Sequence, residues 1–295
     1  MTVPPAPLRD AATVILLREA AAGAPQVLLL RRHARSGFAA RAWVFPGGVA
    51  DPGDRLLPAA SRGSVDERRL ADLLGRPPDV ALGLVVAAIR ETFEEAGLLL
   101  AHTSAGAAPD LSDPAVVRMR RALAQRGAVP AADFNAWVAG AGLVLDLGAL
   151  VPFSRWLTPA VEPRRYDTVF FLARAPQGQV AEHDEVETTG LRWTTAADAL
   201  ADARRGELQL IYPTLRTLEA LAVHPDPGAL LAAAPRTRLR PLQPHAVTDA
   251  DGRVTAILHP DDPAYPWDRY PELRAAASPP TERPDDLGRR PEVRR

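Results

Sequence analysis

The chain of 295 residues carries 35 basic and 36 acidic side chains, giving a formal net charge of −1, and 47% of its residues are hydrophobic. This composition can bury a core, and its charge balance excludes a bulk electrostatic attraction to nucleic acids or anionic membranes. The absence of cysteine excludes disulfides and thiolate chemistry, and it leaves carboxylates and histidines as the strong metal ligands.

The N-terminal part of the chain predicts strands followed by a loop and a short helix. Residues 11–18 and 26–33 are short apolar runs that predict the two strands of a hairpin. A further strand is expected up to Phe45, after which the Pro-Gly-Gly sequence at 46–48 favours an irregular backbone. The polar stretch 55–78 is expected to contain a short helix.

A long helix is expected next. Asp79 is a candidate N-cap for a helix over residues 80–96, and Gly97 is a candidate C-terminal stop. Beyond it, helices and strands are predicted in mixed order. We expect helices within 114–127, 130–142 and 212–224, a strand at 166–175, a strand and helix start over 185–200, and a hairpin over 245–260.

This order of elements predicts an α+β domain with a mixed β-sheet and interleaved helices. We expect the domain over residues 8–222, with insertions at 55–78 and 111–142. A C-terminal extension at 223–274 is expected to pack on the domain, and the Pro-rich residues 275–295 are expected to form a disordered tail. The sequence has no signal-peptide pattern and no run of about 20 apolar residues, so a cytoplasmic protein is expected.

The predicted helix over 80–96 has two unlike faces. At about 100° per residue, one side is apolar and the other gathers Glu91, Glu94 and Glu95, because residues three and four apart are neighbours on a helix. Like charges at this spacing repel each other by a few tenths of a kcal/mol per pair. The apolar side consists of Leu82, Val85, Val86, Ile89 and Phe93.

Two interpretations of this glutamate face remain open from the helix alone. One is a solvated surface, on which Arg90 offers an i, i+4 ion pair to Glu94. The other is a metal site, because Mg²⁺ and Mn²⁺ prefer oxygen ligands and commonly bind one or two carboxylates together with water and substrate phosphates. The glycine-rich loop at 45–54 favours the metal site, since glycines let the backbone approach a ligand closely.

These residues together resemble the signature of the Nudix hydrolase family. Its second half stands as RETFEEAGL over residues 90–98, with Thr92 in place of an apolar residue. Its first half differs from the family signature in two ways. Asp54 replaces the glutamate expected after Gly48, and 35 residues separate Asp54 from Arg90 where the family has seven. A Nudix subfamily that includes a peroxisomal coenzyme A diphosphatase has an insertion at this place, and its flanking sequences are similar to those of this chain.

The resemblance implies the Nudix fold, a mixed sheet sandwiched between helices, in which the insertion leaves the glycines and glutamates adjacent. It also implies hydrolysis of the diphosphate bond in a nucleoside diphosphate linked to another group, with Mg²⁺ or Mn²⁺ as the cofactor. The implied catalytic and metal-binding residues are Glu91, Glu94 and Glu95, with the Gly48 carbonyl as a further metal ligand. Arg90 is implied to orient a glutamate by a charge-assisted hydrogen bond.

An acidic residue from a distant loop is also implied, as a metal ligand or general base. The acidic stretch AEHDEVETTGLRW is the best place for it, and we prefer Glu185 over Glu182, Asp184 and Glu187. A solvated turn is the alternative interpretation of this stretch.

Further assignments concern the substrate phosphates and the first half of the signature. Arg164, Arg165 and Arg32 are candidate phosphate contacts, because arginine suits bidentate contacts to phosphate. Asp54 is expected to act through water or through a neighbouring side chain, since it is one methylene shorter than the glutamate it replaces.

Coenzyme A or acyl-CoA, cleaved to 3′,5′-ADP and phosphopantetheine, is the leading substrate on this resemblance. ADP-ribose, NADH, nucleoside diphosphate sugars and dinucleoside polyphosphates stay open as alternatives. A Nudix-fold ligand sensor without catalysis is a further alternative, although all three glutamates are kept. The resemblance allows a homodimer, and no nucleic acid or membrane partner is expected.

Overall fold

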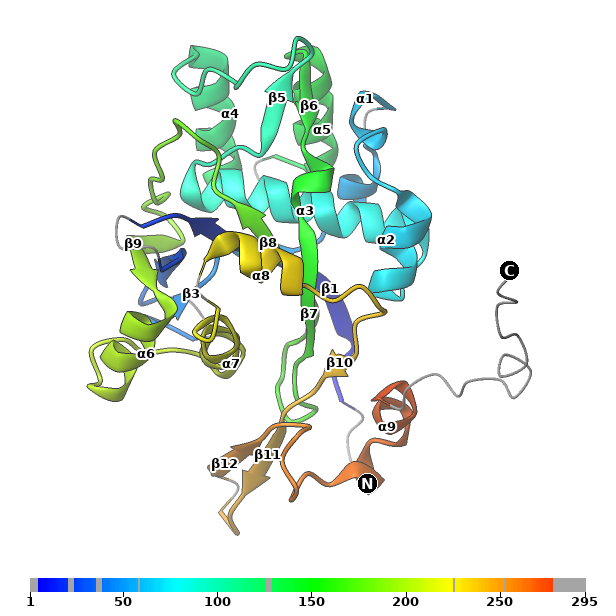
Figure 1. Cartoon of the computed structure of the whole chain (residues 1–295), viewed down its shortest axis with the longest axis vertical. Coiled ribbons are helices and arrows are strands. Elements are labelled where there is room, and N and C mark those ends of the chain that lie inside the picture. Colours follow the sequence, from blue (N-terminus) through cyan, green and yellow to red (C-terminus); the bar gives the residue numbers. More distant parts are fainter. Residues whose placement is uncertain are drawn as a thin grey trace, which may run out of the picture.

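The computed structural model describes residues 5–20, 24–35, 39–57, 59–125, 129–224, 226–251 and 253–277. Within them, one mixed sheet of eight strands forms the centre of the molecule (Figure 1). Its strands are β1 Leu8–Arg18, β2 Gln26–Arg32, β3 Trp43–Val44, β4 Gly47–Val49, β7 Val151–Leu157, β8 Arg165–Arg174, β9 Thr188–Thr195 and β10 Pro241–Leu242.

The sheet is mixed, because two of the strand pairs among the described residues are parallel and the others are antiparallel. The main path runs β10-β7-β8-β1-β2-β3, while β4 pairs with β1 and β9 pairs with β2. Strands β1 and β8 are parallel from Leu8↔Arg165 to Leu17↔Arg174, and β10 is parallel to β7. The predicted hairpin is confirmed, since β1 and β2 are antiparallel with Leu17 opposite Val27.

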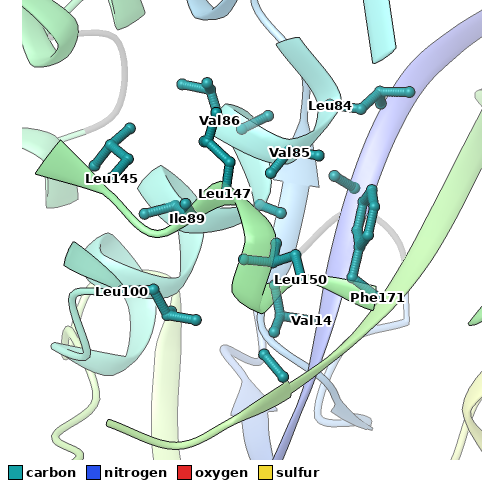
Figure 2. Close-up of a cluster of buried hydrophobic side chains, with 14 of the residues drawn as sticks. Val14, Leu84, Val85, Val86, Ile89, Leu100, Leu145, Leu147, Leu150 and Phe171 are labelled. Atoms are coloured by element: carbon teal, nitrogen blue, oxygen red, sulfur yellow. The ribbon is translucent and has the colours of Figure 1, made fainter. Parts of the chain in front are cut away.

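Helices cover both faces of the sheet. One face packs on α3 Pro78–Ala96, and Figure 2 shows Val14 and Phe171 of the sheet in one buried cluster with Val85 and Ile89 of that helix. The opposite face packs on a second group of helices, because alternate residues of a strand point to opposite sides. These helices are α6 Ala196–Arg204, α7 Tyr212–Leu221 and α8 Pro227–Ala233. The predicted α+β class, with a mixed sheet between helices, is confirmed.

The long helix α3 begins and ends close to the predicted residues, but its N-terminus differs. Its N-cap is Pro77, which makes no side-chain cap, and Asp79 lies in the first turn and pairs instead with Arg55 at 3.3 Å. The prediction of Asp79 as the N-cap was therefore wrong, because the preceding prolines start the helix two residues earlier, at Pro78. The C-terminal stop is confirmed, with Gly97 in the left-handed region at φ 68°.

The segments predicted as insertions are mainly helical. Residues 55–78 contain α1 Ala59–Arg62 and α2 Glu67–Leu74, and α2 buries Leu70 and Leu74 in the cluster around α3. Residues 111–142 contain α4 Pro114–Ala124 and α5 Ala131–Gly140. Two short strands, β5 Ala101–Thr103 and β6 Leu143–Leu145, pair beside them, and the 3₁₀ turns η1 Pro52–Arg55 and η2 Leu147–Ala149 complete this part.

After α7 the chain continues through α8 and β10 to a hairpin at the lower end of Figure 1. The hairpin consists of β11 His245–Thr248 and β12 Val254–Leu258, as predicted, and η3 Trp267–Arg269 and α9 Pro271–Ala277 follow it. Residues 275–277, expected in a disordered tail, are thus helical, and residues 278–295 lie outside the described part of the chain. Among the described residues no helix has the length and apolar character needed to span a membrane.

Candidate active site

The last two turns of α3 and the diglycine of β4 lie against each other. Pairing of β4 with β1 fixes the diglycine beside the helix, with Gly48 opposite Ala12. The backbone N–H of Gly47 donates a hydrogen bond of 2.9 Å to Oε2 of Glu95. The insertion between these segments therefore leaves the glycines adjacent to the glutamates in space.

Gly47 and Gly48 both lie so close to neighbouring atoms that a larger residue would not fit. A Cβ atom on Gly48 would lie 2.5 Å from Oε2 of Glu91, well inside van der Waals contact. A Cβ atom on Gly47, whose φ is 153°, would lie 2.3 Å from the carbonyl oxygen of Ala12. The absent side chain at Gly48 thus leaves room for the Glu91 carboxylate, and the one at Gly47 lets β4 lie close to β1.

Replacing Gly48 with alanine is expected to impair the site more than the fold. The new methyl group would collide with the carboxylate of Glu91, so Glu91 must move away from β4. We expect kcat to fall by about 10-fold or more, since small misplacements at a reacting centre can cost about 100-fold. Turnover and thermal unfolding of Gly48→Ala measure the loss of activity and of stability. The control is Gly63→Ala, because a Cβ atom at that position meets no atom within 4 Å. Equal turnover in both variants would contradict the expectation.

Arg90 forms a buried ion pair with Asp54. Its Nε and Nη2 donate to Oδ1 and Oδ2 of Asp54 at 2.9 and 3.0 Å, and Asp54 is fully buried. Its Nη1 donates to Oε1 of Glu91 at 2.8 Å and lies 3.7 Å from Oε2 of Glu94. Asp54 therefore acts on the glutamates through the Arg90 guanidinium.

The 3₁₀ turn η1 holds Asp54 in place. The Asp51 side chain accepts from the N–H of Gly53 at 2.7 Å, and Asp54 Oδ2 accepts from the N–H of Asp51 at 2.8 Å. Buried Asn135 on α5 donates to the Gly53 carbonyl at 2.9 Å. Sequence reasoning missed Asn135, although a polar residue within the apolar run of 131–138 was an available signal.

Glu94 and Glu95 are buried and the Glu91 side chain is only 15% exposed, which is unusual for glutamates on a helix surface. Burial, together with the charges of Glu91 and Glu187, raises the pKa of Glu94 to about 8. Burial and the charge of Glu91 likewise raise the pKa of Glu95 well above its ordinary value. Burial also raises the pKa of Glu91, although Arg90 beside it lowers it. The solvated-surface interpretation does not fit this environment.

Positive charge at the cluster comes mainly from one side chain. Burial lowers the pKa of Arg90, but the neighbouring Glu91 and Asp54 outweigh this effect, so its net pKa lies above the ordinary value. One guanidinium thus faces several buried carboxylates, and a divalent cation would balance the excess negative charge. In the described part of the chain no three His, Asp or Glu side chains are placed to hold one metal ion together. The donor set therefore suits a cation that shares its coordination with water and substrate phosphates, as Mg²⁺ commonly does.

The acidic loop before β9 approaches the glutamates of α3 through Asp184 and Glu187, and not through Glu185, the residue preferred from the sequence. The charge of Glu187 raises the pKa of Glu91, Glu94 and Glu95, and that of Asp184 raises the pKa of Glu94. Glu185 is exposed, has a φ of 63°, and lines a cavity beside Glu94. The structure thus favours Glu187 over Glu185 as the acidic residue of this loop.

Asp184 shapes the loop. Its Oδ1 accepts from the backbone N–H groups of Val186, Glu187 and Thr188 at 3.0, 3.0 and 2.9 Å. This Asx-type turn carries Glu187 toward the start of β9. Residue spacing alone gives no sign of which acidic side chain such a turn directs inward.

The three candidate phosphate-binding arginines differ in position. Arg32, at the end of β2, lowers the pKa of Glu95 by its charge, and its buried Nε has no hydrogen-bond partner among the described residues. Arg165 donates its Nε and Nη1 to the carbonyl oxygens of Thr158 and Ala6, both at 3.1 Å. Arg164 is exposed in the turn before β8. Only Arg32 of the three is brought to the glutamates by a described interaction.

Comparison with known proteins adds to this geometry. A family model described as the NUDT19 Nudix domain matches residues 57–221, more than half of the chain. The chain belongs to the Nudix hydrolase family. It is therefore a pyrophosphohydrolase, and the Nudix fold and the enzyme class predicted from residues 90–98 are confirmed. Nudix hydrolases generally use divalent metals, which agrees with the carboxylate cluster.

Individual proteins are similar to this Nudix hydrolase over more of the chain than the family model covers. It is 31% identical to acyl-coenzyme A diphosphatase NUDT19 of Gallus gallus, covering 87% of this chain and 81% of that protein. The match to the human protein of that name is 29% identical and spans 67% of this chain but only 60% of the relative. Among solved structures, a NUDIX hydrolase from Alicyclobacillus acidocaldarius is 30% identical, with a TM-score of 0.64 over 77% of this chain and 97% of that one.

Proposed function

We propose that this Nudix hydrolase cleaves the diphosphate bond of coenzyme A and acyl-CoA. Water adds to one phosphorus and the bridging bond breaks, which releases 3′,5′-ADP and phosphopantetheine or its acylated form. The observation that carries the proposal is the buried cluster of Glu91, Glu94 and Glu95 against Gly48. The similarity to the Gallus gallus acyl-coenzyme A diphosphatase, over 87% of this chain, supports the choice of substrate.

The proposed cofactor is Mg²⁺ or Mn²⁺, and its proposed ligands are the carboxylates of Glu91, Glu94 and Glu95 and the Gly48 carbonyl. One ion would use only some of them and would complete its coordination with water and substrate phosphates. When bound, such a cation neutralises charge on the diphosphate and lowers the pKa of water. Arg90 holds the Glu91 carboxylate in position through its 2.8 Å hydrogen bond.

Two further side chains complete the proposal. Glu187 is the proposed general base, because its charge acts on all three glutamates of α3. Arg32 is the proposed contact for a substrate phosphate, because its charge reaches Glu95 and its Nε lacks a described partner. Arginine can bind phosphate oxygens in a bidentate manner.

Turnover of a panel of diphosphates, with products identified by mass spectrometry, tests this function. The panel comprises CoA, acyl-CoA, ADP-ribose, NADH, UDP-glucose and diadenosine polyphosphates, each with Mg²⁺ or Mn²⁺. We expect 3′,5′-ADP from CoA species and slower turnover of the others. A preference for another diphosphate would reject the substrate, and inactivity on the whole panel would favour a ligand sensor.

The stability of the metal-free protein is expected to fall as pH rises. The folded-state pKa of Glu94 is about 8, above its ordinary value. A raised carboxyl pKa contributes stability that is complete at low pH and is lost as pH rises through the folded-state value. In EDTA, Tm should therefore fall as pH rises from the ordinary Glu pKa of 4.5 to the folded-state value of about 8, and excess Mg²⁺ should raise Tm most at the upper end. Glu94→Gln should flatten the EDTA profile, and a wild-type Tm that rises over this range would contradict the expectation.

A further inference from the structure

A cavity of about 720 Å³ lies beside Glu94. It is enclosed by the C-terminal end of α3, by α4 with the segment before it, and by residues 177–185. Its volume falls in the range of small-molecule binding sites. Because Glu94 belongs to the carboxylate cluster, a ligand in this cavity would lie next to the reacting diphosphate.

Part of the cavity lining is apolar. Leu111, Val116 and Val117 come from α4 and the segment before it, Phe93 comes from α3, and Val180 comes from the loop after β8. Phe93 is fixed because it stacks on Trp137 with ring centroids 6.0 Å apart. This wall suits a hydrocarbon chain better than a sugar ring.

The ionisable groups around the cavity are mostly acidic. The carboxylates are Glu94, Asp110, Glu182, Asp184 and Glu185, and the opposing cations are Arg120 and Arg121. Arg120 is engaged by Glu182, through Oε2 at 3.3 Å and through its carbonyl oxygen. This excess of negative charge disfavours a further phosphate or a second nucleotide in the cavity.

Polar groups without partners also line the cavity. The buried atoms Nδ1 of His183 and Oδ2 of Asp184 have no hydrogen-bond partner among the described residues. Buried polar atoms usually have one, because leaving them unpaired costs free energy. Both atoms are almost inaccessible from the cavity, so a ligand would reach them only after a side chain moves.

We propose that this cavity binds the uncharged arm that the substrate carries beyond its diphosphate, an amide-containing chain that ends in an apolar acyl group. The inference rests on the proposed function and specifies the substrate as an acylated pantetheine derivative. The nucleotide half, with its additional phosphate, then lies outside the cavity, on the Arg32 side of the glutamates.

Val117→Trp tests the inference, because Val117 lines the cavity and is only partly buried. The indole should occupy the site of the acyl chain. We expect kcat/KM for acyl-CoA to fall about 10-fold or more through KM, while inhibition by 3′,5′-ADP stays unchanged. Val180→Asp, at a position 75% exposed, should act in the same direction without stressing the core. The matched control is Val223→Trp, at a position 79% exposed and outside the cavity.

Calorimetric binding of acyl-pantetheine, which has no diphosphate, separates this inference from the proposed function. Binding to wild type that is lost in Val117→Trp and Val180→Asp supports the cavity even if no CoA species is hydrolysed. Hydrolysis of acyl-CoA with unchanged KM in both variants would overturn the cavity assignment and leave the function standing. Weakened inhibition by 3′,5′-ADP in both variants, equal to the loss for acyl-CoA, would also overturn it.

Discussion

Replacing Glu95 with Gln is expected to lower kcat by about 10²–10³-fold, the effect of removing one preorganised electrostatic group from a reacting centre. Glu95 is hydrogen-bonded to the diglycine, accepting from the N–H of Gly47 at 2.9 Å. The amide oxygen of Gln can accept the same hydrogen bond, so β4 and α3 should stay in place. The charge is removed and the packing is kept.

Phosphate-coupled turnover with Mg²⁺, measured beside thermal unfolding, tests this expectation. Without metal, Glu95→Gln should unfold at the wild-type temperature or above it, since burial already disfavours the charged form of Glu95. The control is Glu19→Gln, whose side chain is 77% exposed. Unchanged turnover in Glu95→Gln would remove Glu95 from the proposed metal ligands.

Replacing Arg90 with Gln is expected to destabilise the protein by about 3–5 kcal/mol, the usual result of breaking a buried ion pair from one side. Asp54 is fully buried and its carboxylate is held at 2.9 and 3.0 Å by Arg90. Without the guanidinium this charge has no counterpart, and Glu91 loses its 2.8 Å partner as well. Activity should fall together with stability.

A double-mutant cycle in urea, with the metal removed, measures this effect. Asp54→Asn removes the stranded charge, so Arg90→Gln with Asp54→Asn should be clearly more stable than Arg90→Gln alone. The exposed pair Arg55 and Asp79, 3.3 Å apart, provides the control cycle, for which about 0–1 kcal/mol is expected. Additive losses at Arg90 and Asp54 would show that the pair is not coupled.

Much of the fold could be predicted from local patterns. The hairpin of β1 and β2, the extent of α3 and its stop at Gly97 follow from apolar periodicity and glycine chemistry. The start of α3 could not be predicted as well, because Asp79 and the prolines before it are both good helix-start signals. The helix starts at the prolines, and Asp79 in its first turn pairs with Arg55, a residue distant in sequence.

Several features of the site could not be predicted from the sequence, because they depend on contacts between distant segments. The spacing of Glu91, Glu94 and Glu95 gives a shared face but not its burial, which depends on β4, η1 and the loop before β9 packing around it. The preference for Glu185 over Glu187 rested on position in an acidic stretch, whereas the Asp184 turn determines which side chain approaches α3. Asn135 lies 82 residues from its partner Gly53, so no local pattern pairs them.

Binding of Mn²⁺ to the metal-free protein, followed by the electron paramagnetic resonance signal of the free ion, tests the central claim most directly. Wild type should remove Mn²⁺ from solution, and added Mg²⁺ should release it. Glu91→Gln combined with Glu95→Gln should abolish this binding, while Glu19→Gln should bind as wild type does. Mn²⁺ binding that is equal in wild type and in the double variant would contradict the assignment of the α3 glutamates as the metal site.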